Sequence, residues 1–440
     1  MFSDRIIIGK TKISSLQSYS KQLENARILK SKIINDPVYG FITVPGELAF
    51  RIIEHPYFQR LRRIKQLGLT HLVFPGAHHT RFQHSLGAMH LMTEALNSLR
   101  AKGYEISPEE IEAAELAILL HDIGHGPFSH ALENSIVDGI NHEDISLLFM
   151  EKLNEETNGR LDTAIKIFQN RYPRKFFHQL VSGQLDVDRL DYLKRDSFFC
   201  GVSEGIVSLD RVIKTLVILD DNIGVEAKGI YSIEKFIISR RLMYWQVYLH
   251  KTVLSAEALL IRILRRAKEL ARNGSKLFAT PPLLFFLENP IDRSTFASDP
   301  STLSNFARID DFDIFSAIKT WSTHPDYILS TLCRALVDRE LFRVEMQSSP
   351  FPGEEVERIR ALVLKEMPTL TYEETNYFVF NDITSNYSYD PFDNRISVLL
   401  KDGQVIDLPE ASGLFNLTIL TEPDVKYVLG YPKKIRYVEN

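Results

Sequence analysis

The stretch HDIGHGPFSH, residues 121–130, brings three histidines and an aspartate together with two glycines and a proline. It follows AAELAILL (113–120), an apolar run typical of a buried helix. The glycines and the proline make that helix hard to continue. His121 and Asp122 are therefore expected where a buried helix ends, beside any cleft that forms there.

Histidines concentrate in one part of the chain, with ten of the thirteen lying between positions 55 and 142. Beside Asp122 they offer neutral imidazole next to carboxylate, a ligand set that suits Mn²⁺, Fe, Ni²⁺, Co²⁺ or Mg²⁺ with open positions for water and substrate. The two cysteines, Cys200 and Cys333, are too few for a thiolate zinc site. Adjacent residues on a helix point in different directions, so further ligands must come from elsewhere in the chain.

The composition excludes several classes of protein. With 440 residues, 44% of them hydrophobic, and a formal net charge of −5, the chain has no general basic surface for strong, sequence-independent nucleic-acid binding. The N-terminus lacks a signal-peptide core, and no segment approaches the roughly 20 apolar residues of a membrane span. Together with the scarcity of cysteine, these features indicate a soluble, cytoplasmic protein with no membrane partner.

The pattern along the chain predicts a mainly α protein with a smaller C-terminal α+β region. The stretch IINDPVYGFITV (33–44) predicts a turn between short extended flanks, and Asp402-Gly403 between two apolar runs predicts a β-hairpin. Apolar residues recur at helical spacing through most of the chain before about residue 350. The expected divisions are a leader (1–32), a helical core (33–270), a helical extension (271–350) and the α+β region (351–440).

The order of histidine and aspartate along the chain is specific. His84, the pair His121-Asp122, and Asp188 lie within the segments VFPGAHHTRFQHSLG, HDIGHGPFSH and LDVDRLDYLKRD. These segments resemble the H…HD…D signature of the HD-domain deoxynucleoside triphosphate (dNTP) triphosphohydrolases. The resemblance is strongest to the branch that includes the vertebrate antiviral enzyme joining a sterile-alpha-motif domain to an HD domain. It covers roughly residues 32–270, and no sterile-alpha-motif domain is expected here.

The resemblance implies an HD-domain helical fold and a metal-dependent reaction. Family members cleave between the α-phosphorus and the 5′ oxygen of a dNTP, releasing a deoxynucleoside and tripolyphosphate, with the nucleophile supplied by a metal-activated water. It implies one or two divalent metals, such as Mn, Mg or Fe, held by His84, His121, Asp122 and Asp188. It also implies His130 as the general acid, His125 and His142 against the α-phosphate or the attacking water, and Glu143 as a carboxylate that orients an imidazole.

The resemblance also implies how the nucleotide is bound. Gln66 would bond the sugar 3′-OH and Leu67 would crowd out a 2′-OH, so that deoxyribose is preferred. Arg81 lies within one helical turn of His84, where its guanidinium can bind phosphate. The remaining implied contacts are Arg189 and Arg240 on the phosphates, Tyr192 and Asp196 in the sugar pocket, and Tyr248 near the base.

Several residues match positions that hold activator nucleotides in the tetrameric antiviral relative. The resemblance therefore implies a homo-oligomer, a tetramer, activated by a dNTP or a GTP-type nucleotide. Glu54 stands where the relative has the aspartate that reads guanine, which leaves the activator's base open. The matching residues are Ile33, Asn35, Glu54, Gln59, Arg62, Val73, Arg211, His250 and Lys251.

Two other functions are compatible with parts of this pattern. The first is an HD-type phosphohydrolase of another nucleotide, such as a cyclic dinucleotide or guanosine tetraphosphate. The second is a catalytically weak nucleotide sensor, or a weak single-stranded nucleic-acid binder that uses the basic segment 59–65. Arg81 and the Gln66-Leu67 pair favour the dNTP reaction over the first, and the complete set of ligand residues favours an enzyme over the second.

Overall fold

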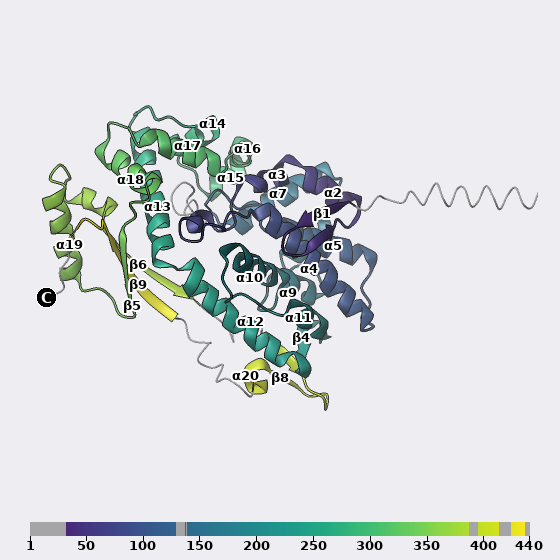
Figure 1. The fold of residues 1–440 in the computed structure, drawn as a ribbon. Helices are drawn as coiled ribbons and strands as arrows, with labels where there is room; N and C mark the ends of the chain where they lie inside the picture. The colour runs from purple at the N-terminus through teal and green to yellow at the C-terminus, as the bar shows by residue number, and fades with distance from the viewer. Residues whose placement is uncertain (1–31, 129–136, 138, 387–394, 413–423, 436–440) are drawn as a thin grey trace, which may run out of the picture.

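The computed structural model describes residues 32–128, 137, 139–386, 395–412 and 424–435. The fold is mainly α, as the sequence predicts, with small sheets at the N-terminus, at the base of the helical body and near the C-terminus (Figure 1). Across the described residues, no helix combines the length and the apolarity that crossing a bilayer requires.

Three helices form the centre of the helical body: α4 (Arg81–Ala101), α5 (Pro108–Leu120) and α10 (Val187–Cys200). Helix α4 packs against both of the others. The helices begin at recognisable caps: α4 and α5 have capping boxes, and the side chain of Asp186 accepts from the backbone N–H of Arg189 at the start of α10. Around them lie α2 (Gly46–Glu54), α3 (Pro56–Gln59), η1 (Arg60–Arg63), η2 (Gly68–Leu72), α7 (His142–Glu156), α8 (Asp162–Phe168), α9 (Lys175–Val181) and α11 (Leu209–Thr215).

Two long helices lead away from this body. Helix α12 (Ile230–Met243) passes through the single π-helical turn η4 (Tyr244–Tyr248) into α13 (Lys251–Arg272), and Figure 1 shows both crossing the middle of the molecule. Helix α13 contacts α14, α18 and the strand β5. The helices that follow are α14 (Pro281–Glu288), α15 (Arg293–Ser298), α16 (Pro300–Phe306), α17 (Asp311–Trp321), α18 (Tyr327–Val337), α19 (Gly353–Glu366), η5 (Glu373–Tyr377) and α20 (Leu408–Ala411).

The strands of the described residues form three small sheets. The stretch after residue 32 folds as the expected hairpin, β1 (Ile33–Asp36) with β2 (Gly40–Thr43). The hairpin expected at Asp402-Gly403 is also present, as β7 (Ser397–Leu399) and β8 (Val405–Asp407). The other strands are β3 (Leu216–Leu219) and β4 (Asn222–Glu226), which extend the β7–β8 sheet, with η3 (Ala227–Gly229) following, and β5 (Arg343–Gln347), β9 (Asp424–Tyr431) and β6 (Phe380–Asn386), paired in that order.

The strands β3, β4 and β5 lie in stretches that the sequence analysis expects to be helical. The domain boundaries themselves stay a prediction, but β5 pairs antiparallel with β9, so the two sides of position 350 share a sheet. Strand β4 likewise pairs with β7 from the far end of the chain. Both pairings join residues distant in sequence, which local periodicity cannot reveal.

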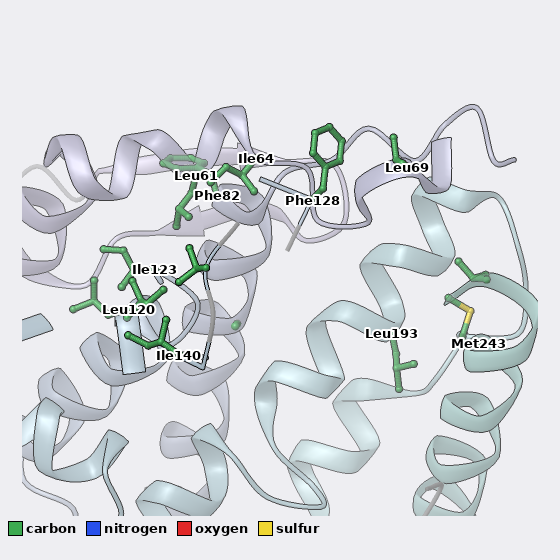
Figure 2. Packing of buried hydrophobic residues seen from close by; sticks show 14 of the residues in the cluster. Leu61, Ile64, Leu69, Phe82, Leu120, Ile123, Phe128, Ile140, Leu193 and Met243 are labelled. Atoms are coloured by element: carbon green, nitrogen blue, oxygen red, sulfur yellow. The ribbon is translucent and has the colours of Figure 1, made fainter. Parts of the chain in front are cut away.

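The hydrophobic core is continuous beneath the predicted metal ligands. Figure 2 shows Leu120 and Ile123, on either side of the His121-Asp122 pair, grouped near Leu61 and Phe82. All four side chains are at most 2% exposed. The His-Asp pair is therefore held between two anchored apolar residues, which restricts the backbone on both sides of it.

One buried carboxyl in this core makes stability depend on pH. Glu115 on α5 is 3% exposed and accepts a hydrogen bond from Thr93 Oγ1 at 2.7 Å. Burial raises the pKa of Glu115 to about 7 despite that hydrogen bond. A raised carboxyl pKa means that the folded state is favoured by protonation, so stability is lost as pH rises from the ordinary value of 4.5 through 7.

We expect Glu115→Gln to raise the free energy of unfolding at pH 8 by about 1–3 kcal/mol and to change it little at pH 4.5, because the neutral amide removes the cost of a buried charge. Urea denaturation at both pH values measures this. Glu109→Gln, an exposed change in the same helix, is the control. Equal effects of Glu115→Gln at both pH values would contradict the assignment.

Candidate active site

The four predicted metal ligands come together from three separate elements. His84 lies on α4, His121 and Asp122 directly follow α5, and Asp188 lies in the first turn of α10. The Nε2 atom of His84 is 3.0 Å from Asp188 Oδ1 and 3.7 Å from Asp122 Oδ2. The Nε2 atom of His121 is 3.3 Å from Asp122 Oδ1 and 3.4 Å from Asp188 Oδ1. Nitrogen and oxygen ligand atoms thus face one another around a common point.

The orientation of the two imidazoles fits a divalent cation. His84 Nδ1 lies 2.8 Å from Asp191 Oδ2, and His121 Nδ1 lies 2.6 Å from the carbonyl oxygen of Ile118. Each ring therefore donates from Nδ1 and turns Nε2 inward, the usual arrangement of a metal-binding histidine. Within the described part of the chain, both Nε2 atoms are buried and make no hydrogen bond. His84, His121 and Asp122 form a group able to hold a metal ion.

Electrostatics keeps both carboxylates of the group ionised. Burial alone would raise the pKa of Asp122, but His121, His125 and Arg81 outweigh it and hold that pKa well below its usual range. The pKa of Asp188 is lowered too, because its contacts with His121 and His84 outweigh burial. Two ionised, largely desolvated carboxylates make this a point where positive charge is stabilised.

A second group of possible ligands shares Asp122. It consists of Asp122, His125 and His142, whose ligand atoms lie within 4.8 Å of one another. His125 Nε2 is 3.2 Å from Asp122 Oδ1, and the rings of His125 and His142 stack with centroids 3.8 Å apart. Burial, helped by the charge of Arg81, lowers the pKa of His125 to about 3, so this imidazole is neutral at physiological pH. Glu143, next along α7, is exposed.

His130, the predicted general acid, lies outside the described residues. The role predicted for His130 therefore stays a prediction. The two other histidines of the same group, His125 and His142, lie beside the ligand cluster. Their position is compatible with contacts to a substrate phosphate.

A buried arginine that the sequence analysis did not single out holds the His-Asp segment. Arg60 is fully buried and donates hydrogen bonds of 2.8 Å to the carbonyl oxygens of Ile123 and His125. Its guanidinium lies over the rings of Phe149 and Phe306, at 5.5 and 5.1 Å from their centroids. Two backbone carbonyl groups of the His-Asp segment are thus hydrogen-bonded to one buried guanidinium instead of to water.

The close approach of α7 explains why position 124 in HDIGHG is a glycine. A Cβ atom at this position would lie 2.2 Å from both the carbonyl oxygen of His142 and the backbone nitrogen of Ser146. The N–H of Gly124 donates to Ser146 Oγ at 2.8 Å. The absent side chain lets the start of α7 approach the His-Asp segment and brings His142 to it.

Most of the residues predicted to bind sugar or base are connected to one another. Asp196 Oδ2 accepts a hydrogen bond from Tyr248 at 2.8 Å, and its Oδ1 lies 2.7 Å from His79 Nε2. The ring of Tyr192 contacts that of Tyr248, with centroids 6.1 Å apart. The backbone N–H of Gln66 donates to the carbonyl oxygen of His79 at 3.0 Å, so His79 joins the Gln66 segment to Asp196.

Among the described residues, Gln66 Oε1, His79 Nδ1 and Arg240 Nε are buried polar atoms without a hydrogen bond. Such atoms are uncommon in folded proteins, and a bound polar ligand could satisfy them. Leu67 is partly buried against the core. Arg81 is the first residue of α4 and donates a hydrogen bond to Asp122.

Arg189 is placed differently from the phosphate contact that the resemblance implies. Its guanidinium donates to the Asp186 carboxylate and to the carbonyl oxygen of Gly183, both at the start of its own helix. To contact a phosphate, the Arg189 guanidinium would have to share its N–H donors between the phosphate and these two acceptors. The role predicted for Arg189 therefore stays a prediction.

The residues predicted to bind an activator are spread over several elements. Gln59 and Arg62 are adjacent on α3 and η1, with Arg62 Nε donating to Gln59 Oε1 at 2.9 Å. His250 and Lys251 begin α13 next to Val73, since the rings of Phe74 and His250 are 6.1 Å apart. The others are Ile33 and Asn35 on β1, Glu54 at the end of α2, and Arg211 on α11, which lines a surface hollow with Lys214 and Lys228.

The chain is similar in sequence and in structure to several known proteins. The chain matches the HD domain over residues 81–196 and the HD associated region over residues 207–278. It is 52% identical to a phosphohydrolase from Bacteroides thetaiotaomicron whose crystal structure gives a TM-score of 0.88, over 91% of this chain and 99% of that one. The Bacillus subtilis protein YwfO is 32% identical over 93% of this chain and 94% of its own length. A Dictyostelium discoideum protein named deoxynucleoside triphosphate triphosphohydrolase SAMHD1 homolog is 31% identical over 61% of this chain and 56% of its own length.

Proposed function

We propose that this chain, which belongs to the HD-domain phosphohydrolase family, is a metal-dependent dNTP triphosphohydrolase that releases a deoxynucleoside and tripolyphosphate. The observation that carries the proposal is the convergence of two inward-facing imidazoles and two ionised carboxylates, with a cluster of polar and aromatic side chains further along α10. The metal ligands can hold a divalent cation, and Asp188 lies on the same helix, α10, as Tyr192 and Asp196. The Dictyostelium relative that carries this activity in its name supports the choice of substrate.

In the proposed reaction, a water oxygen attacks the α-phosphorus, the bond from phosphorus to the 5′ oxygen breaks, and that oxygen takes up a proton. His84, His121, Asp122 and Asp188 would hold the divalent cation, which when bound polarises the phosphate and activates water. Arg81 is placed to neutralise phosphate charge beside Asp122. Neutral His125, with His142 stacked on it, can accept the proton of the attacking water or bind the α-phosphate. His130 is the proposed donor to the 5′ oxygen.

The sugar pocket supports a preference for deoxyribose. Asp196 receives one hydrogen bond from Tyr248 and faces His79 with its other oxygen, which leaves lone pairs for a sugar 3′-OH. Burial, with the neighbouring Asp196, raises the pKa of Tyr248 far above its usual value, so its hydroxyl remains a donor. Gln66 brings its unbonded Oε1 to the same site, and Leu67 would exclude a 2′-OH.

The metal, the assembly and the cellular setting belong to the same proposal. Mn, Mg or Fe suit the ligands, and the second group sharing Asp122 offers a place for a second ion. Activation by a dNTP or GTP-type nucleotide, a homotetramer and a cytoplasmic location are proposed from the family resemblance. Arg62, Arg211 and Lys251 are basic side chains among the matching residues, which supports an activator that carries phosphates.

Product analysis tests the proposed function. Metal-loaded protein is incubated with each dNTP, alone and in mixtures, and with the matching ribonucleotides, and the products are separated by chromatography. We expect deoxynucleoside and tripolyphosphate in equal amounts, little cleavage of ribonucleotides, and activity that increases in mixtures if an activator is required. No cleavage of any dNTP with Mg²⁺, Mn²⁺ or Fe²⁺ would overturn the substrate assignment; cyclic dinucleotides and guanosine tetraphosphate are then the substrates to test.

A further inference from the structure

A line of buried charged side chains connects the N-terminal hairpin to the metal group. His84 Nδ1 faces Asp191 Oδ2 at 2.8 Å, and Arg195 donates to both oxygens of Asp191, at 2.9 and 3.0 Å. Arg195 also donates to Asp36 Oδ2 at 2.7 Å. The side chains of His84, Asp191 and Arg195 are 0% exposed and that of Asp36 is 4% exposed. None of these contacts is therefore screened by bulk water.

Asp36 also shapes the turn from which it reaches Arg195. Its Oδ1 accepts hydrogen bonds from the backbone N–H groups of Val38 and Tyr39, at 2.9 and 3.0 Å. The ring of Tyr39 lies under Lys194 Nζ, at 4.6 Å from the ring centroid, and against His90 of α4, with centroids 5.1 Å apart. The tip of the β1–β2 hairpin is thus docked onto both α10 and α4, the helices that carry Asp188 and His84.

Asp36 and Asp191 share one guanidinium, which decides how firmly Asp191 holds His84. With both carboxylates present, Arg195 divides its donors between them, and Asp191 keeps lone pairs for the His84 ring. Without the charge on Asp36, the whole guanidinium charge acts on Asp191. Asp191 then accepts less strongly from His84 Nδ1–H, and His84 Nε2 becomes a weaker and less well oriented ligand.

We propose that Asp36 and Arg195 are positioning residues for the metal ligand His84, and that docking of the β1–β2 hairpin and metal binding are coupled through them. The coupling is reciprocal, since a hairpin that strengthens metal binding is itself stabilised by the metal. The proposal rests on the metal-binding part of the proposed function and is independent of which nucleotide is cleaved.

Asp36→Asn isolates the contact. The asparagine oxygen can still accept from Val38 and Tyr39 and keeps the long 3.4 Å contact with Arg195 Nη2, but its amide NH₂ replaces the oxygen that accepts at 2.7 Å from Arg195 Nη1. Mn²⁺ is titrated into the chelator-stripped, full-length protein by calorimetry. We expect the Kd for Mn²⁺ to rise about tenfold, since such outer contacts typically change metal affinity about 10–100-fold. Glu115→Gln is the control. It removes a buried carboxylate elsewhere, on α5, and should leave the Kd for Mn²⁺ unchanged.

A double-mutant cycle separates this role from general destabilisation. If Asp36 acts through Asp191, then Asp36→Asn should weaken Mn²⁺ binding much less in an Asp191→Asn background than in the wild type. Equal effects in both backgrounds, or a wild-type Kd for Asp36→Asn, would overturn the proposal. Arg195→Lys, which keeps the charge but not the fork, provides the same test if Asp36→Asn does not fold. A wild-type protein that binds Mn²⁺ without cleaving dNTPs would refute only the substrate assignment.

Discussion

Asp122→Ala is expected to lose both bound metal and hydrolytic activity. Asp122 belongs to both groups of possible ligands, and its oxygens face His121 at 3.3 Å and His125 at 3.2 Å while it pairs with Arg81. Removing it leaves Arg81 buried beside two imidazoles and takes away half of the carboxylate charge that would hold a cation. Losing one electrostatic stabiliser of a transition state commonly costs about 10²–10³-fold, and here the metal is lost with it, so we expect a fall of more than about 10³-fold.

Metal content by mass spectrometry and turnover by product chromatography test this expectation. Asp144→Ala is the matched control, because Asp144 is an acid of α7 that belongs to neither group of possible ligands and pairs with Arg293 at 3.0 Å. It should keep both metal and activity. A metal-replete, active Asp122→Ala protein would refute the ligand assignment, and His121→Ala should repeat the loss.

The features that the sequence predicts correctly have local signals. The end of α5 follows from an apolar run stopped by glycine and proline, and the β7–β8 hairpin follows from Asp402-Gly403. The H…HD…D order identifies residues from three helices, which the structure brings within 3.0 to 3.7 Å of one another. Hydrophobic periodicity and helix-breaking residues are local features of a few residues. The order of a motif is a property of the sequence itself. All three can therefore be recognised without a structure.

The β3–β4 hairpin is missed because its turn lacks the usual residues. Asp220 and Asp221 occupy the two central positions with φ of 47° and 63°, where glycine or asparagine is the common choice. The Asp-Asp pair therefore gives only a weak turn signal between short strands. Strand β4 is further stabilised by pairing with β7, about 170 residues later in the chain. The sequence near either strand gives no signal of such long-range pairing.

The supporting residues of the site are missed for a different reason. Arg60, Asp191 and Arg195 are charged residues, which ordinarily lie on the solvated face of a helix, yet each is fully buried here. Only Asp191 has a usable signal, since it follows Asp188 by three residues and so shares a helix face with a predicted ligand. The burial of Arg60 and Arg195 depends on Phe306 and Asp36, which are distant in sequence.

Gly87→Ala is the second large effect that we expect. Gly87 lies on α4, one turn after His84, where α4 packs against α10. A Cβ atom here would be 2.0 Å from Asp191 Oδ1 and 2.2 Å from an Arg195 terminal nitrogen. Alanine normally favours a helix over glycine by about 0.5–1 kcal/mol. In this position the methyl group would have to break a buried ion pair, so we expect a net loss of about 2–4 kcal/mol in the free energy of unfolding.

Urea denaturation of the metal-free protein and Mn²⁺ titration measure the two consequences of that methyl group. Because the displaced pair is the one that holds His84, the Kd for Mn²⁺ should rise even at temperatures where Gly87→Ala remains folded. Gly353→Ala, at the first residue of α19 with nothing within 4 Å of its Cβ position, should be neutral or slightly stabilising. A Gly87→Ala protein with wild-type stability and Mn²⁺ affinity would mean that Asp191 and Arg195 can move aside freely. The metal ligand would then owe its position to α4 alone, and neither Asp191 nor the hairpin behind it would be needed to hold it.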